Sequence, residues 1–310
     1  MRRAFSDSLL KIARQDERVI FLTGDLGFQV FDDFVAEFPK RYLNMGVAEA
    51  QMVDCAAGLA LEGWKPIVYS IASFMTGRAF EQIRLSLGYH NLTTVVVGAG
   101  GGYGYAASGV THHAKEDLAL MSLVPNFSVV NPGDPTEVTE LLPQLLNLPG
   151  PSYMRVGKFG EPKVPSEEPI VLGRGRLIRP GERVAFLTTG SSLVQATEAA
   201  DRLAAEGKRP VVCHFHTVKP LDTALLADVA AQVNTIIAVE DHGLMGGLRS
   251  AVVQFLAGSA NMPRVVGVGP DDGMILGNPT QAEIMARFGM GTDALVTTCR
   301  DLWTSSYGSS

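Results

Sequence analysis

Hydrophobic positions in the first half of the chain follow two alternating patterns. Short runs that are wholly apolar, such as Val19-Ile20-Phe21-Leu22, have the length of buried strands. Longer segments between them carry apolar residues every three or four positions, which is typical of amphipathic helices. The pattern predicts strands at 19–22, 66–70, 94–97, 127–131 and 152–155, and helices at 5–13, 49–62, 75–87, 115–123 and 135–146.

Uniformly apolar strands that alternate with helices indicate a parallel sheet covered on both faces. After residue 156 the pattern changes, because residues 158–169 contain proline, glycine and charge without any period. The alternation then resumes, with strands predicted at 184–188, 210–214 and 235–240 and helices at 192–205, 221–231 and 247–256. We therefore expect two α/β domains with mainly parallel sheets, at 1–156 and 183–310, joined by a linker at 157–182.

Composition narrows the possible partners. The length of 310 residues exceeds what one hydrophobic core usually supports, which agrees with two domains. The net charge is −6 without a sustained basic run, so neither nucleic acid nor a membrane surface is expected as a partner. With no visible signal peptide and no apolar run of about 18 residues, a cytoplasmic location is expected. Three scattered cysteines predict neither a disulfide framework nor a metal site.

The first candidate for chemistry is Glu49, at the start of a helix otherwise rich in small and apolar residues. A carboxylate buried in such a helix needs a partner or a proton. It has two interpretations: an ordinary first-turn glutamate favoured by the helix dipole, or an acid that shares a proton with a ligand nitrogen. Spacing alone favours the first.

The second candidate is the glycine-rich segment 97–113, which follows a predicted strand. Ligands bind at the carboxyl ends of strands in open α/β sheets, although this spacing is not a dinucleotide fingerprint. His112 at its end is a candidate acid, base or hydroxyl ligand, while His113 is expected to face solvent. Phe74, just past another strand, is either a core side chain or a ring that stacks on a flat heterocycle. Taken alone, each of these residues is more easily read as structural.

Taken together and in order, these stretches resemble the pyrimidine-binding and C-terminal domains of transketolases. The resemblance is closest to the C-terminal subunit of split transketolases, which work as two chains, and it covers nearly the whole sequence. The segments that carry it are 45–49, 74–84, 97–112, 131–134, 216–222 and 240–248.

The resemblance implies thiamine diphosphate as cofactor. Glu49 matches the glutamate that hydrogen-bonds a pyrimidine nitrogen and relays a proton there. Phe74 matches the aromatic ring that stacks on the pyrimidine, and Ile71 falls where a second cofactor contact is expected. Asp25 matches an acid near the cofactor at a subunit interface.

The resemblance also implies a sugar substrate. His112 matches a histidine on the substrate side and is expected to serve catalysis as well as binding. Arg155 and Arg3 match arginines that hold a sugar phosphate, a task suited to the bidentate guanidinium fork. For each arginine the alternative is a surface ion pair.

Two positions of the substrate loop depart from the transketolase pattern. Gly100 stands where the family has a histidine, and Ser108 where it has an acid. In the family, the side chains at these two positions bind the phosphate and a hydroxyl of the donor, through hydrogen bonds worth about 1.5–3 kcal/mol each. Because the loop also gains Tyr103 and Tyr105, we expect a donor or acceptor other than the usual pentose phosphates, less polar or bound to a carrier.

The chain lacks the Gly-Asp-Gly segment and paired asparagines with which the family binds the Mg²⁺-diphosphate. The resemblance therefore implies an N-terminal, diphosphate-binding partner subunit, in an α2β2 assembly, which holds most of the Mg²⁺ site. The expected activity is transfer of a two-carbon ketol unit from a ketose, or ketose phosphate, to an aldehyde or carrier-bound acceptor. Alternatives are the β subunit of a 2-oxo-acid dehydrogenase and a non-catalytic assembly subunit.

Overall fold

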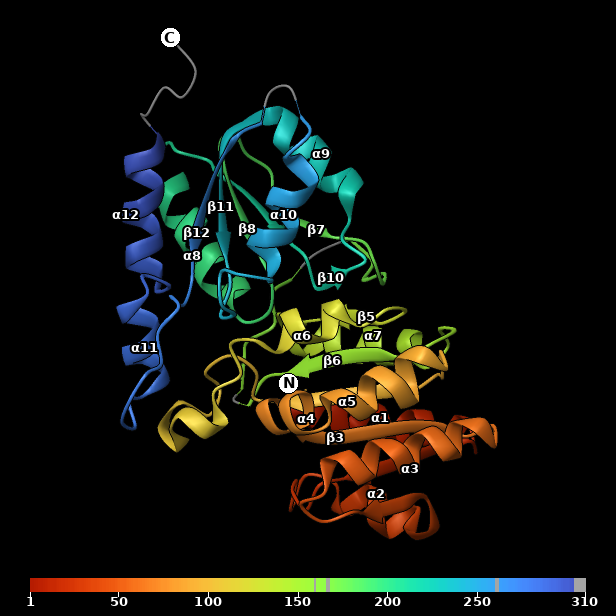
Figure 1. Cartoon of the computed structure of the whole chain (residues 1–310). Helices are drawn as coiled ribbons and strands as arrows, with labels where there is room; N and C mark the ends of the chain where they lie inside the picture. The colour runs from red at the N-terminus through yellow and green to blue at the C-terminus, as the bar shows by residue number, and fades with distance from the viewer. Residues whose placement is uncertain (159, 166–167, 260–261, 304–310) are drawn as a thin grey trace.

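The computed structural model describes residues 1–158, 160–165, 168–259 and 262–303, and shows two α/β halves packed against each other (Figure 1). Within these residues, the first half contains a seven-stranded sheet of order β10-β5-β6-β4-β3-β1-β2. Its strands are β1 (Val19–Thr23), β2 (Tyr42–Asn44), β3 (Lys65–Ile71), β4 (Val95–Ala99), β5 (Ser128–Val130), β6 (Ser152–Val156) and β10 (Thr217–Lys219). The last of these, β10, comes from the second half of the sequence and pairs with β5.

The second half is built on a five-stranded sheet of order β12-β11-β8-β9-β7 in the described residues. Its strands are β7 (Arg176–Arg179), β8 (Arg183–Thr188), β9 (Val211–His214), β11 (Val233–Val239) and β12 (Arg264–Val268). All pairings in both sheets are parallel except those of β10 with β5 and β7 with β9. The prediction of two mainly parallel α/β sheets is therefore confirmed.

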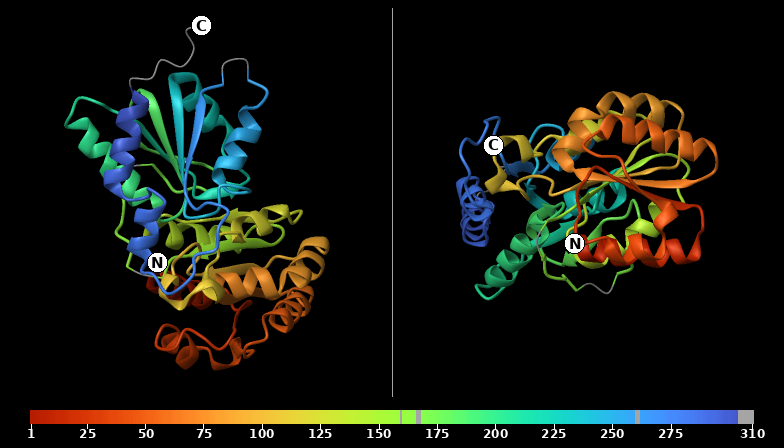
Figure 2. Two further views of the ribbon diagram at one scale, coloured as in Figure 1. Left: turned by 60° about the vertical axis from the view of Figure 1, so that its left-hand side comes forward. Right: turned by 90° about the horizontal axis from the view of Figure 1, so that it is seen from below.

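Helices cover both sheets (Figure 2). The first half has α1 (Arg2–Gln15), α2 (Asp32–Glu37), α3 (Glu49–Leu61), α4 (Ala72–Arg78), α5 (Phe80–Gln82), α6 (Asp117–Leu123) and α7 (Pro135–Leu145). The second has α8 (Ser192–Ala204), α9 (Thr223–Gln232), α10 (Leu248–Leu256), α11 (Gln281–Arg287) and α12 (Thr292–Trp303). Short 3₁₀ helices form η1 (Pro39–Arg41), η3 (Ala106–Ser108) and η4 (Val110–His112), and a π-helix forms η2 (Ile83–Tyr89). In the described part of the chain, no helix is long and apolar enough to span a membrane.

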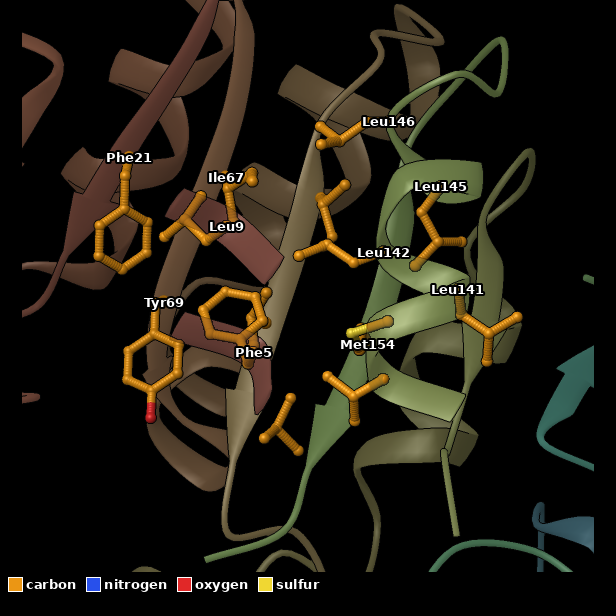
Figure 3. Close-up of a cluster of buried hydrophobic side chains, with 14 of the residues drawn as sticks. Phe5, Leu9, Phe21, Ile67, Tyr69, Leu141, Leu142, Leu145, Leu146 and Met154 are labelled. Atoms are coloured by element: carbon orange, nitrogen blue, oxygen red, sulfur yellow. The ribbon is translucent and has the colours of Figure 1, made fainter. Parts of the chain in front are cut away.

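The apolar strands bury both of their faces, which is why they carry no alternation of polar residues. Along β1, Phe21 packs on one side with α1 and α7, whereas Leu22 packs on the other with α3. Figure 3 shows the first of these layers, in which Phe5 of α1 stacks on Tyr69 of β3. Burial of one such side chain stabilises the fold by about 1.5–3 kcal/mol.

Some elements differ from the sequence-based expectation. The helix expected at 75–87 is three pieces, α4, α5 and the π-helix η2, and Gly77 in the last turn of α4 has low helix propensity. The strands β2 and β10 were not predicted, because three residues are too few to show a period. The second sheet already begins with β7 at Arg176, inside the segment expected to be a linker.

Buried charge joins the two halves. The Glu137 carboxylate, at the start of α7, accepts hydrogen bonds from the backbone of Gly133, from Arg176 of β7 and from His214 of β9. The interactions with His214 and Arg176 lower the pKa of Glu137 to about 2, against the effect of its full burial. Removing one member of such a buried network typically costs about 3–5 kcal/mol.

His216 beside this network predicts a pH dependence of stability. Burial lowers the pKa of its ring to about 4, whereas the unfolded chain takes the proton near pH ~6.5. The unfolded state thus binds more protons between these values, so stability is full above pH ~6.5 and falls as the pH drops toward 4. The contribution of this ring is on the order of 3 kcal/mol.

We therefore expect His216→Gln to reduce the loss of unfolding free energy between pH 7 and pH 4.5, measured by denaturant titration. His90→Gln, which changes an exposed histidine, is the control and should leave that loss unchanged. An equal loss in wild type and His216→Gln would contradict this assignment.

Candidate active site

Four neighbouring strands bring the candidate residues to one edge of the first sheet. The strands β1, β3, β4 and β6 are parallel neighbours, so their carboxyl ends lie side by side. After β1 comes Gly24, after β3 comes Phe74, after β4 comes the glycine-rich loop, and after β6 comes Lys158. Such an edge is where open α/β sheets bind ligands.

Glu49 lies at this edge with its carboxylate out of water. It is the first residue of α3 and only 2% exposed. Ser70 Oγ, from the end of β3, donates to Oε1 at 2.9 Å, and Arg78 Nη1 donates to Oε2 at 3.2 Å. A hydroxyl and a guanidinium thus satisfy the buried acid, which is more than a surface first-turn glutamate would need.

The backbone after β1 passes close to this carboxylate because residue 24 is glycine. A Cβ atom at that position would lie 3.3 Å from Ser70 Oγ and 3.6 Å from Glu49 Oε1. A larger residue would therefore press on the hydrogen bond between them.

Phe74 lies beside Glu49, in the first turn of α4. The ring is half-buried and is not part of either core layer of this sheet, so the interpretation of Phe74 as a core residue is wrong. The Arg78 guanidinium lies 3.9 Å above the ring centroid, and the ring of His112 meets Phe74 at 4.9 Å between centroids. One guanidinium thus contacts both the buried acid and the aromatic ring, an arrangement that suits planar, nitrogen-rich groups.

His112 ends the turn η4 and is half-buried at the same edge. Its Nδ1 lies 2.9 Å from Thr111 Oγ1. Burial lowers the pKa of the ring, and the neighbouring cation Lys158 lowers it further. At neutral pH the ring is therefore uncharged and able to donate or accept one hydrogen bond at a ligand hydroxyl.

The glycine-rich loop is held in place by the second half of the chain (Figure 2). Tyr103 is buried and stacks on Phe288, which follows α11, at 6.2 Å between centroids. His113 meets the same tyrosine at 4.9 Å, and its Nε2 lies 3.1 Å from the carbonyl oxygen of Ala106. The expectation that His113 faces solvent is wrong, because this contact inside the loop buries the ring.

Comparison with known protein families agrees with this geometry. The model of the transketolase pyrimidine-binding domain matches residues 1–159, and that of the transketolase C-terminal domain matches residues 173–292.

This chain belongs to the transketolase family.

Relatives of transketolase type match nearly the whole chain. It is 32% identical to one subunit of the apulose-4-phosphate transketolase of Phocaeicola vulgatus, covering 96% of this chain and 95% of that protein. It is 34% identical to a 6-deoxy-6-sulfo-D-fructose transketolase subunit of Clostridium sp. (strain MSTE9), covering 86% and 84%. A solved structure described as a split-gene transketolase in an inactive β4 tetramer matches with a TM-score of 0.89 and 32% identity, over 98% of both chains.

In this transketolase-family chain, the structure gives Arg155 an internal role. Its buried guanidinium donates to both oxygens of Asp117, to the Ala114 carbonyl and, across the junction between the halves, to Asp241. Arg3 instead lies exposed on α1, in ion pairs with Asp7 at 2.9 Å and Asp33 at 3.5 Å. Among the described residues, the hydrogen bonds and ion pairs of these two arginines thus lead away from Glu49 and His112.

The remaining expected positions of the transketolase site lie along the same edge. Ile71 is the last residue of β3, and Asp25 is exposed just after β1, where its carboxylate accepts a hydrogen bond from Asn44 Nδ2 at 2.9 Å. Ser108 is exposed at the end of η3. Gly100 has a φ of 68°, and a Cβ atom there would come within 2.2 Å of the Tyr105 ring.

Sequence reasoning missed Ser70 and Arg78 as partners of Glu49. Weak signals for both exist in the sequence. Ser70 is a polar residue at the end of an apolar strand, and Arg78 is four positions after Phe74, which places both side chains on one helix face.

Loss of the Tyr103 ring is expected to loosen the loop that carries His112. Replacing a buried aromatic residue by alanine costs about 3–5 kcal/mol, and here the missing contacts are those between the loop and the second half. We expect Tyr103→Ala to accelerate amide hydrogen exchange in residues 100–114, measured by mass spectrometry on the full chain. Phe255→Ala, on α10, is the control, and unchanged exchange of the loop in Tyr103→Ala would contradict the expected role.

Proposed function

We propose that this chain is the pyrimidine-binding subunit of a two-chain, thiamine-diphosphate-dependent transketolase. The enzyme would move a two-carbon ketol unit from a ketose donor to an aldehyde acceptor. The observation that carries this proposal is the buried Glu49 carboxylate, which shares the Arg78 guanidinium with an accessible aromatic ring at the carboxyl edge of a parallel sheet. Both of these groups already bind one planar cation, the Arg78 guanidinium.

The residues present fit the pyrimidine half of the cofactor. Glu49 would bind a ring nitrogen through its carboxylate, Phe74 would stack on the ring, and Ile71 and Asp25 would lie at its borders. When bound, thiamine diphosphate supplies a carbanion that accepts and releases the two-carbon unit. The task of Glu49 is to hold a proton at the ring nitrogen, and the surrounding protein excludes water from that contact.

His112 would act on the substrate side of the same edge. The ring contacts Phe74, and its neutral state allows it to bind a substrate hydroxyl and to accept or donate a proton there. Arg78 would act as a positioning residue, since it orients both Glu49 and Phe74.

The diphosphate and most of the Mg²⁺ site would come from a separate N-terminal subunit, in an α2β2 assembly. Support comes from the relatives, two of which are themselves named as subunits. The similar β4 tetramer is described as inactive, as expected for chains that hold only half of a site. These relatives do not favour a 2-oxo-acid dehydrogenase subunit.

The donor we propose is a ketose that ends in an anionic group. The two relatives named for their substrates act on a sugar phosphate and on a sulfo sugar, whose far ends carry a phosphate and a sulfonate. These names favour a charged substrate over the less polar one expected from Gly100 and Ser108.

The central test is Glu49→Gln in the complex reconstituted with the partner subunit. The amide keeps the shape of the side chain but cannot hold the proton, so we expect turnover to fall about 10²- to 10⁴-fold. Glu62→Gln, directly after α3, is the matched control and should retain activity. Turnover unchanged by Glu49→Gln would favour a non-catalytic assembly subunit instead.

A further inference from the structure

Lys158 and Tyr105 form a contact beyond His112 that the family resemblance does not assign. Lys158 follows β6, and its Nζ lies 4.1 Å from the centroid of the Tyr105 ring. The same ring lies 5.9 Å from that of His112. A cation held over an aromatic face at this distance is stabilised by the ring electrons.

The side chains that follow β3, β4 and β6 lie in a row, in the same order as these strands in the sheet. From Glu49 the contacts run through Arg78 to Phe74 after β3. They continue to His112 and Tyr105 after β4, and finally to Lys158 after β6. Lys158 therefore lies at the opposite end of this row from the carboxylate that would meet the cofactor. A substrate that reacts at a cofactor bound over Glu49 and Phe74 would extend its far end toward Tyr105 and Lys158.

The backbone of the loop is built around the Tyr105 ring. Any side chain at Gly100 would collide with the ring, and a Cβ atom at Gly104 would lie 2.8 Å from the Gly100 Cα. The two departures from the transketolase pattern, glycine at position 100 and tyrosine at position 105, therefore depend on each other. Tyr105 fills the space that opens when position 100 has no side chain.

Lys158 lies close to a second cation, the Arg2 guanidinium. Burial lowers the pKa of its amine, and the nearby Arg2 guanidinium lowers it further. Two acids line the same hollow as Lys158: Glu161 binds the amino group of Met1 at 2.9 Å, and Asp241 binds Arg155. Cations held close together repel each other, and an anion placed between them would relieve that repulsion.

We propose that Tyr105 and Lys158 form a specificity element for the anionic end of the substrate. Lys158 binds a terminal phosphate or sulfonate, and Tyr105 sets the position of the amine. Arg155 lines the same hollow, but its hydrogen bonds go to Asp117, to the Ala114 carbonyl and to Asp241. This inference rests on the proposed function, because it assumes that a ketose lies along the row from Glu49.

The kinetic test uses Lys158→Met in the reconstituted complex, with a ketose phosphate, its sulfonate analogue and the uncharged ketose. We expect KM to rise about 10- to 100-fold for the charged ketoses, with little change in kcat, and to stay unchanged for the uncharged one. Tyr105→Leu should act in the same direction. Lys163→Met, on the same connection between the halves, is the control. Equal effects on all three substrates, or none, would overturn the proposal.

A second readout does not depend on turnover. Inorganic phosphate and inorganic sulfate should protect Lys158 of the complex from acetylation, whereas Lys163 should remain reactive, as measured by mass spectrometry. Protection without turnover of any ketose would support the anion site while the proposed function fails. Turnover of charged ketoses with no protection of Lys158 and no change of KM in Lys158→Met would overturn the anion site alone.

Discussion

A carboxylate held out of water is the constraint on which the site depends. Glu49 can stay buried because Ser70 of β3 and Arg78 of α4 bind its two oxygens. Those bonds tie the start of α3 to the end of β3 and fix the guanidinium above Phe74. The acid and the ring are therefore held at the same end of the sheet by one guanidinium.

The second half of the chain helps to position the residues of this site. Tyr103 anchors the loop of His112 on Phe288, and Arg155 joins Asp117 of the first half to Asp241 of the second. Burial makes each tie costly to break, since a lone buried charge or a lost ring has no compensating contact. The position of His112 is thus set partly by residues more than 100 positions away.

Local patterns in the sequence predicted most strands and helices, because a strand buried on both faces must be apolar throughout. The same logic singled out Glu49, an acid at the start of a helix made mostly of small and apolar residues. The roles of Arg155, His113 and Tyr103 could not be read in this way. Each depends on a partner from another segment, and nothing in the residues around it along the chain specifies that partner. Arg155 and Arg3 illustrate why sequence alone is not enough. Both are arginines, yet Arg155 forms a buried ion pair between the two halves, whereas Arg3 forms an ion pair on the surface.

Titration of thiamine diphosphate, with Mg²⁺ present, into this chain alone, into its partner alone and into their complex tests the division of the site most directly. If Glu49 and Phe74 supply only the pyrimidine half, calorimetry should detect tight binding in the complex and far weaker binding to this chain by itself. Equally tight binding to the isolated chain, accompanied by ketose turnover, would contradict the account.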